Sequence, residues 1–184
     1  MLSLMRMNKI DPVDMGNMTV TVQPGAFLCD VAQAAQTAGL FYPPDPGERT
    51  ASIGGTVATN AGGMRAVRYG LTRDYVRALE VVLPDGDIVE LSSIVDKNTT
   101  GYDLKALIIG SEGTLCILTS ITLKLLAAPK HSQTLVVHFP ALEPCIDTVY
   151  LEPFVGKRVH DLFKSVKRMF DEKNILNPGK IVEL

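Results

Sequence analysis

The stretch from residue 42 to residue 70 constrains the fold of this chain most, because it begins stiff and then becomes poor in side chains. Its stiffness comes from three prolines, each of which fixes its own φ angle: Pro43, Pro44 and Pro46. Two glycine doublets follow, Gly54–Gly55 and Gly62–Gly63, with small polar residues between them. Backbone of this kind can bring main-chain N–H groups close to a flat or anionic ligand.

Two interpretations of this stretch stay open on composition alone. In one, it is the floor of a cofactor site, where the donors of Gly54–Gly55 face a pyrophosphate and a following short helix adds its positive end. In the other, it is a glycine-rich surface loop. The segment 110–115, GSEGTL, has a similar pair of interpretations, a ligand contact or a tight turn before a strand.

Composition indicates a globular protein. The chain has 184 residues, of which 46% are hydrophobic and 21% charged, enough for one domain with a core. A net charge of −2 gives no reason to expect nucleic acid or an anionic membrane as partner, and no run approaches the about 20 apolar residues of a membrane span. The cysteines are odd in number and widely spaced: Cys29, Cys116 and Cys145. This pattern favours neither a disulfide framework nor a zinc site. It therefore indicates a reducing compartment, the cytoplasm.

Alternation and turn residues predict the elements of the first half. A β-branched alternating run predicts a strand over 19–22. Apolar residues on one face predict a helix over 27–38, with Gly39 in the position that ends it. Two strand patterns within 76–91, joined by Pro84–Asp85–Gly86, predict a hairpin.

The second half is predicted to hold a short helix over 103–109 and strands over 115–126 and 134–139. Its clearest pattern is a helix over 155–170, with an apolar face of Val155, Val159, Leu162, Phe163, Val166, Met169 and Phe170. The opposite, polar face holds Lys157, Arg158, Asp161, Lys164 and Lys167. Since hairpins and helices do not alternate strictly, the sequence predicts an α+β fold, a mixed sheet flanked by helices.

Several familiar motifs do not occur. There is no G-x-G-x-x-G fingerprint, and Gly113 is followed by Thr114 where a P-loop has lysine. Ser111 lies in G-S-E-G rather than G-x-S-x-G, so a nucleophile elbow is not predicted. No metal site is predicted, because the histidines lack metal-ligand spacing: His131, His138 and His160. Three arginines either hold a substrate carboxylate or cofactor phosphate, or belong to a solvated surface: Arg65, Arg68 and Arg73.

Five segments in a fixed order carry a resemblance to a known family. They are YPPDPGERTASIGGTVATNAGG (42–63), RYG (68–70), VVLPDGDIVE (81–90), KNTTGYDLKALIIGSEGTLCILTSITLKL (97–125) and ILNPGK (175–180). In this combination the chain resembles the FAD-linked oxidases of the vanillyl-alcohol oxidase/p-cresol methylhydroxylase type. Within them it is most similar to the D-lactate dehydrogenase and glycolate oxidase flavin-subunit branch. The resemblance covers roughly residues 19–140 and 150–184.

That resemblance implies a fold and a set of FAD contacts. The fold is the second subdomain of a p-cresol-methylhydroxylase-type FAD-binding domain within 1–149, followed by a C-terminal helix and tail in 150–184. Backbone beside the flavin and pyrophosphate comes from Pro44, Asp45, Ile53, Gly54, Gly55, Asn60, Gly62, Gly63, Tyr69 and Gly70. The ribose and adenine side is lined by Glu112, Gly113 and Ile117. From the tail, Asn177 returns to the isoalloxazine ring.

The chain also departs from the family pattern. Members begin with a smaller subdomain that carries an arginine- and glycine-rich phosphate loop, and this chain starts after it. Their long substrate domain is missing here, with the join near Val149–Tyr150, as is the histidine–glycine motif of related hydroxy-acid dehydrogenases. Neither a catalytic base nor a histidine for covalent flavin attachment is therefore predicted.

The resemblance implies an FAD-dependent oxidoreductase that oxidises a D-2-hydroxy acid such as lactate or glycolate by hydride transfer to flavin, as a shortened member or fragment. A protein or quinone would accept the electrons. One alternative is a non-catalytic flavin-binding module or a subunit that completes another chain. The other is a truncated product whose exposed apolar surface favours aggregation.

Overall fold

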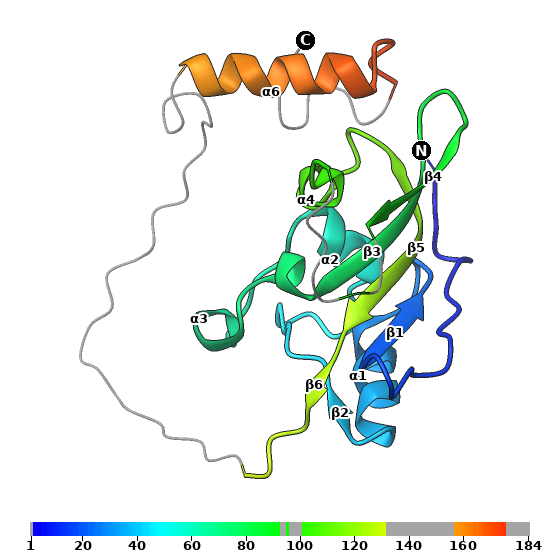
Figure 1. The fold of residues 1–184 in the computed structure, drawn as a ribbon, viewed down its shortest axis with the longest axis vertical. Helices are drawn as coiled ribbons and strands as arrows, with labels where there is room; N and C mark the ends of the chain where they lie inside the picture. Colours follow the sequence, from blue (N-terminus) through cyan, green and yellow to red (C-terminus); the bar gives the residue numbers. More distant parts are fainter. Residues whose placement is uncertain (1, 93–94, 96–100, 132–156, 176–184) are drawn as a thin grey trace, which may run out of the picture.

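The structure is a computed structural model that describes residues 2–92, 95, 101–131 and 157–175. At its centre is a four-stranded antiparallel sheet in the order β1–β5–β3–β4 (Figure 1). The strands span Thr19–Val22 (β1), Val76–Val82 (β3), Ile88–Ser92 (β4) and Ile117–Lys124 (β5). The central strands supply much of the core, because Leu79, Val81, Ile121 and Leu123 are buried almost completely.

The hairpin predicted over 76–91 is confirmed as β3 and β4, which pair from Ala78 with Ser92 to Val82 with Ile88. Gly86 has a φ of +98°, a conformation that glycine adopts readily. Its N–H donates to the carbonyl of Leu83 at 2.9 Å, which closes the turn. The turn residues therefore act as the sequence predicts.

The helix predicted over 27–38 is confirmed as α1 (Leu28–Thr37), which buries Leu28, Val31 and Ala35. Gly39 ends it with a φ of +74°, and its N–H donates to the carbonyl of Gln36 at 2.9 Å. The chain then enters β2 (Leu40–Phe41), which pairs antiparallel with β6 (Leu126–Ala127) in a separate two-stranded sheet. The strand predicted over 115–126 is thus divided between β5 and β6.

The glycine-rich stretch forms short helical turns rather than an open loop. They are α2 (Ile53–Ala58), α3 (Ala66–Tyr69) and the 3₁₀ turn η1 (Thr72–Tyr75). Ser52 caps α2, because its hydroxyl oxygen accepts from the N–H of Gly55 at 3.2 Å. In Figure 1, α2 lies near the sheet and α3 stands out from the body of the molecule.

Two further helices follow. The short helix predicted over 103–109 is confirmed as α4 (Leu104–Ile108), whose N-terminus is capped by the carboxylate of Asp103. The long helix is confirmed as α6 (Lys157–Phe170), which lies across the top of Figure 1. The predicted strand 134–139 lies outside the described residues.

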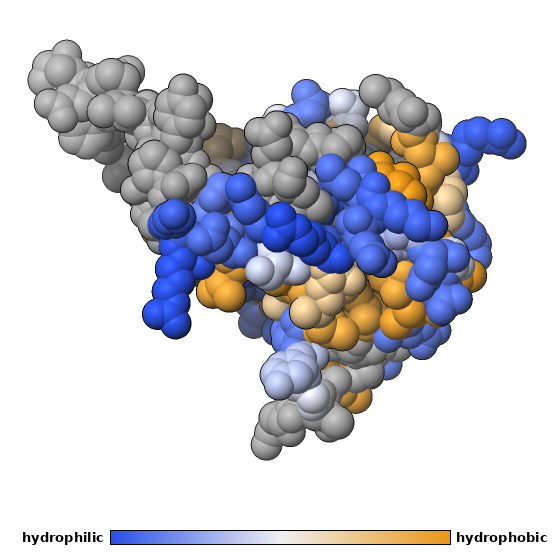
Figure 2. Space-filling view, turned by 90° about the horizontal axis from the view of Figure 1, so that it is seen from above, coloured by the Kyte–Doolittle hydropathy of each residue, from blue (hydrophilic) through white to orange (hydrophobic). Residues whose placement is uncertain are grey.

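The orientation predicted for α6 is partly wrong. Val166 and Phe170 do pack against the core, but Leu162 and Met169 are 58% and 79% exposed. Lys167, predicted on the polar face, is instead buried. Figure 2 views the molecule from the side of α6 and shows apolar surface between charged side chains. Of the predicted apolar face, only Val166 and Phe170 are therefore packed against the core within the described part of the helix.

The α+β class is confirmed by this arrangement of helices and sheet. Where the sequence predicts a mixed sheet, the strands of the described residues pair antiparallel only. Among those same residues, no helix combines the length and the apolar character needed to cross a membrane.

Candidate functional site

The proline-rich segment and the second glycine doublet meet in the structure. A Cβ atom on Gly63 would overlap the carbonyl oxygen of Asp45, so the two backbones are in direct contact. Arg65 strengthens this approach through an ion pair with Asp45, at 3.4 Å between Nη2 and Oδ2. Pro44, next to Asp45, is buried. Three predicted site residues, Pro44, Asp45 and Gly63, are therefore neighbours.

The first glycine doublet has a different environment at each residue. A Cβ atom on Gly54 would lie 2.7 Å from Cβ of Pro24, so this glycine allows α2 to pack against the chain. Gly55 is exposed, and its Cβ would meet only the hydroxyl oxygen of Ser52, at 3.0 Å. Only Gly55 of this doublet thus presents bare backbone to the outside.

The N–H groups at the start of α2 already have partners within the protein. Ile53 donates to Ala26 and Gly54 to Pro24, each at 2.8 Å to a carbonyl oxygen, and Gly55 donates to the Ser52 hydroxyl. These donors are not free for a phosphate. The interpretation in which the positive end of this helix holds a pyrophosphate is therefore not supported here.

Open donors occur at the second doublet instead. Within the described part of the chain, the N–H groups of Gly62, Gly63 and Met64 have no hydrogen-bond acceptor. Gly63 and Met64 are exposed, and Arg65 follows directly. Three consecutive amides beside a guanidinium are suited to an anionic group.

An aromatic and cationic cluster adjoins these amides. The rings of Phe41 and Tyr69 meet edge to face with centroids 5.7 Å apart. The Arg65 guanidinium lies 5.2 Å from the Phe41 centroid, and Arg68 lies 5.2 Å from that of Tyr69. Two of the three arginines thus contact aromatic rings rather than being merely solvated. Sequence reasoning missed Phe41, which has no motif and is placed by its pairing in β2.

Asn60 and Arg73 join the end of α2 to the 110–114 turn. Asn60 has a φ of +48°, and its side-chain oxygen accepts from the N–H of Arg73 at 3.0 Å. The Arg73 guanidinium donates to the carbonyl of Ile109 at 3.3 Å. Arg73 differs from the other two arginines in that its guanidinium donates to a backbone carbonyl rather than lying over an aromatic ring.

The turn after α4 is bonded to α2. Gly110 donates to the carbonyl of Val57 at 3.0 Å, and Glu112 to that of Ala58 at 2.8 Å. Glu112 and Gly113 have positive φ angles of +51° and +70°, so the turn is tight. Glu112 therefore lies beside α2 in a tight turn before β5, and the FAD contact of Glu112 and Gly113 stays a prediction.

The remaining predicted residues are more dispersed. Ile117 begins β5, where it pairs with Val82. The carbonyl of Tyr69 accepts from the Tyr75 hydroxyl at 2.7 Å, and Gly70 (φ +83°) is in close contact with the carboxylate of Asp74. Asn177 lies outside the described residues.

Tyr42 is a residue that sequence reasoning passed over. Its side chain is only 2% exposed, and its hydroxyl has no hydrogen-bond partner among the described residues. Burial raises its pKa, and the nearby Tyr75 ring, 6.1 Å away between centroids, adds to this effect. A buried hydroxyl without a protein partner is satisfied by a bound ligand or an ordered water. Its one signal in the sequence is its place directly before the prolines.

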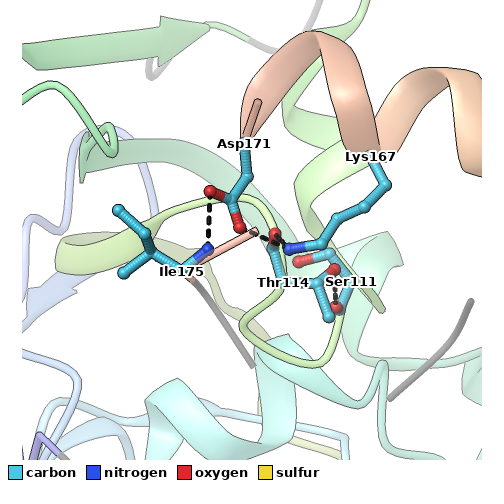
Figure 3. A network of polar contacts seen from close by, with 5 residues as sticks. All are labelled: Ser111, Thr114, Lys167, Asp171 and Ile175. Atoms are coloured by element: carbon cyan, nitrogen blue, oxygen red, sulfur yellow. Dashed lines mark hydrogen bonds and ion pairs between the residues drawn. The ribbon is translucent and has the colours of Figure 1, made fainter. Parts of the chain in front are cut away.

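The C-terminal helix reaches the 110–114 turn through a polar network (Figure 3). The ammonium of Lys167 donates to the carbonyl of Thr114 at 2.7 Å and pairs with Asp171 at 2.6 Å. The other carboxylate oxygen of Asp171 accepts from the N–H of Ile175 at 3.0 Å. This network connects α6 with the turn that adjoins α2.

The donor set fits one type of ligand better than others. Open amides at 62–64, two guanidiniums and aromatic edges suit a molecule that has both a flat ring and anionic phosphates, as FAD has. The start of α2 does not fit the phosphates, because its donors are in use. No group of three or more potential metal ligands occurs in the part of the chain that the structure describes.

Comparison with family profiles finds two matches. Residues 1–92 match "FAD binding domain", and residues 145–181 match "FAD linked oxidases, C-terminal domain". The first match alone includes half of the chain, and the second includes α6.

Curated relatives include enzymes of hydroxy-acid oxidation. The chain is 57% identical over 149 residues to D-lactate dehydrogenase of Anaerostipes hadrus, covering 81% of this chain and 31% of that protein. It is 44% identical over 144 residues to glycolate oxidase subunit GlcD of Bacillus subtilis (78% and 31%). It is 46% identical over 145 residues to D-2-hydroxyglutarate dehydrogenase of Xanthomonas citri (77% and 30%). The chain thus spans less than a third of the length of these relatives.

Solved structures support the same fold. A structure of alkyldihydroxyacetonephosphate synthase matches with a TM-score of 0.59 and 33% sequence identity. The match covers 68% of this chain and 22% of that one. The architecture therefore corresponds to part of a longer relative.

Proposed function

Because the chain belongs to the FAD-linked oxidases, whose cofactor is FAD, we propose that it supplies part of an FAD site in an oxidoreductase that acts on a D-2-hydroxy acid. Relatives named for D-lactate, glycolate and D-2-hydroxyglutarate favour a small 2-hydroxy acid as the substrate. The observation that carries the proposal is the contact between Asp45 and Gly63, beside the open amides of 62–64.

We assign two roles to the residues of this region. Gly55, together with Pro44 and Asp45, forms a wall of backbone for the flat ring. The amides of 62–64, with Arg65, hold the anionic part of the cofactor. The wider set of proposed FAD contacts is Pro44, Asp45, Ile53, Gly54, Gly55, Asn60, Gly62, Gly63, Tyr69, Gly70, Glu112, Gly113, Ile117 and Asn177.

Within that set the structure favours indirect roles for several members. Gly54 lets the start of α2 pack closely against Pro24. Asn60, after the end of α2, accepts a hydrogen bond from the N–H of Arg73. When bound, FAD supplies a hydride acceptor, and the protein residues orient it and exclude water. No described residue is assigned as the base for the substrate hydroxyl.

We further propose two units, a partial FAD-binding domain over 1–149 and a C-terminal helix and tail over 150–184. The electron acceptor in this proposal is a separate protein or a quinone. The free thiols of Cys29 and Cys116 are in keeping with the proposed cytoplasmic location.

A second candidate function is that of a flavin-binding subunit that completes another chain. Met64, which carries the last of the open amides, and Val67, three residues later, are 83% and 104% exposed. Apolar side chains this exposed beside a ligand site are suited to covering by further protein. In this candidate, FAD binds but the chain alone does not turn over substrate.

The experiment compares Gly55→Ala with the unchanged chain. Alanine is favoured over glycine in a helix by up to about 1 kcal/mol, and the added Cβ meets only the Ser52 hydroxyl, so the fold is retained. If FAD lies against Gly55, the methyl group weakens FAD binding at least about tenfold, about 1.4 kcal/mol. Flavin fluorescence titration measures the affinity, and circular dichroism checks the fold.

Equal FAD affinity in the two proteins would remove Gly55 from the site, and no FAD binding by the unchanged chain would refute the proposed function. Dye reduction with D-lactate, glycolate or D-2-hydroxyglutarate then separates the two candidates. Turnover supports the dehydrogenase, whereas bound flavin without turnover supports the subunit.

A further inference from the structure

We propose that Lys167 and Asp171 are positioning residues, a buried ion pair through which α6 holds the 110–114 turn in the geometry that FAD binding requires. The proposal rests on the proposed function, since the turn carries two of the assigned FAD contacts. It concerns a pair of side chains that neither the motifs nor the glycine pattern of the sequence singled out.

The pair is enclosed in the protein. Lys167 is 3% exposed and Asp171 is fully buried. The ammonium group lies 2.6 Å from a carboxylate oxygen of Asp171 and 2.7 Å from the carbonyl oxygen of Thr114 (Figure 3). A buried lysine that donates both to its counter-ion and to a loop carbonyl fixes the loop as well as neutralising its own charge.

Packing alone does not require this pair. Val166 and Phe170, on the same helix, already contact the hydrophobic core. A buried ion pair is often no more stable than apolar residues of similar size, because both charges must leave water. The ion pair instead specifies a geometry, because the Lys167 ammonium is satisfied only where the Thr114 carbonyl and the Asp171 carboxylate are both within hydrogen-bond distance.

The backbone of the 110–114 turn adopts conformations that neighbouring segments must hold in place. Gly110, Glu112 and Gly113 all have positive φ angles, and Glu112 is not a glycine. On one side the turn is bonded to the carbonyls of Val57 and Ala58 in α2. On the other side it is bonded to Lys167, so it is held between α2 and α6.

The same pair reaches toward the tail. The second oxygen of Asp171 accepts from the N–H of Ile175, two positions before Asn177, the tail residue assigned to the flavin. The Asp171 carboxylate thus binds both the Lys167 ammonium and the backbone of Ile175, just after α6. Loss of the pair is expected to loosen the turn and the residues up to Ile175 together.

The test replaces the pair with apolar residues, in the double variant Lys167→Met/Asp171→Leu. Its control is Lys157→Met/Asp161→Leu, which changes two exposed residues of the same types and spacing in α6. Hydrogen exchange of the protein without FAD is followed by mass spectrometry. In the buried-pair variant, exchange at residues 111–116 rises at least tenfold, while α1 and the central sheet keep their protection and the control stays as the unchanged chain.

FAD affinity supplies the second measurement. The buried-pair variant binds FAD at least tenfold more weakly at a temperature where its circular dichroism equals that of the unchanged chain. If the chain binds no FAD, the proposed function fails, but hydrogen exchange without FAD still tests whether the ion pair holds the turn. The two proposals can therefore be refuted independently. Unchanged exchange at 111–116, or an equal rise everywhere, would overturn the positioning role.

A second variant covers the case in which the double variant does not fold. Asp171→Asn keeps the shape of the side chain but leaves one acceptor oxygen for both Lys167 and Ile175. Faster exchange at 111–116 and at Ile175, with the sheet unaffected, supports the proposal. Unaltered exchange at both places overturns it.

Discussion

The two glycine doublets look alike in the sequence but do different work in the structure. Gly54–Gly55 lies in the first turn of α2, where the N–H donors are all used within the protein. Gly62–Gly63 lies outside any helix, with open amides and a backbone contact to Asp45. The comparison teaches that a glycine pair marks close approach of backbone, but the partner in that approach can be the protein itself rather than a ligand.

The largest effect is expected at the second doublet. In Gly63→Ala the new methyl group collides with backbone atoms of Asp45 and Pro46, so the two segments must move apart. We expect a loss of about 3 kcal/mol in unfolding free energy, or roughly 6–12 °C in Tm, measured by thermal denaturation. Gly55→Ala is the matched control, and similar Tm values for both variants would contradict the distinction between the doublets.

A smaller effect on stability tests whether the core beside α2 excludes water. Cys116 shares the core with Ile53 and Val57 of α2, and burial raises the pKa of its thiol from 9.0 to about 12. Below pH 9 the thiol is protonated in both states. Between about pH 9 and 12 only the unfolded chain loses the proton, so stability falls by about 1.4 kcal/mol per pH unit, about 2 kcal/mol at pH 10.5.

Urea denaturation of the unchanged chain and Cys116→Ala across pH 8–10.5 measures this fall. The variant should lack it, although both proteins share any contribution of Tyr42, whose pKa burial also raises. Parallel pH profiles would show that the core beside α2 admits water.

The smallest effect on stability is expected at Arg65. Its ion pair with Asp45 is partly exposed, so Arg65→Met should lower the unfolding free energy by only about 0.5 kcal/mol. FAD affinity should fall more, about fivefold, because the guanidinium beside the open amides is lost. Fluorescence titration compares this variant with Lys9→Met, which breaks an exposed pair with Asp11. Equal FAD affinities in these two would move the anionic part of the cofactor away from 62–65.

Much of the fold follows from local patterns in the sequence. The hairpin, α1 and α4 are confirmed because turn residues, caps and apolar periodicity all act within a few residues of one another. The sequence predicts a short helix only after Gly54–Gly55, whereas α2 includes both glycines. The Ser52 cap and the close packing on Pro24 offset the low helix propensity of glycine.

The site was less accessible to prediction than the fold. The contact between Asp45 and Gly63 joins segments separated in sequence, and no local pattern reports it. The burial of Lys167 is likewise invisible to periodicity, since its partners are Asp171 beyond the end of α6 and a carbonyl 53 positions away. The motif resemblance, rather than the pattern, indicated FAD.

Because the side chain of Lys167 is buried, reagents in solution cannot reach its ammonium group in the native protein. Trypsin and amine-acylating reagents should leave this lysine untouched in the native protein, while the acylating reagents modify exposed lysines of the same helix, such as Lys157. Cleavage or acylation at Lys167 would then report each moment at which the C-terminal helix lifts from the body of the protein.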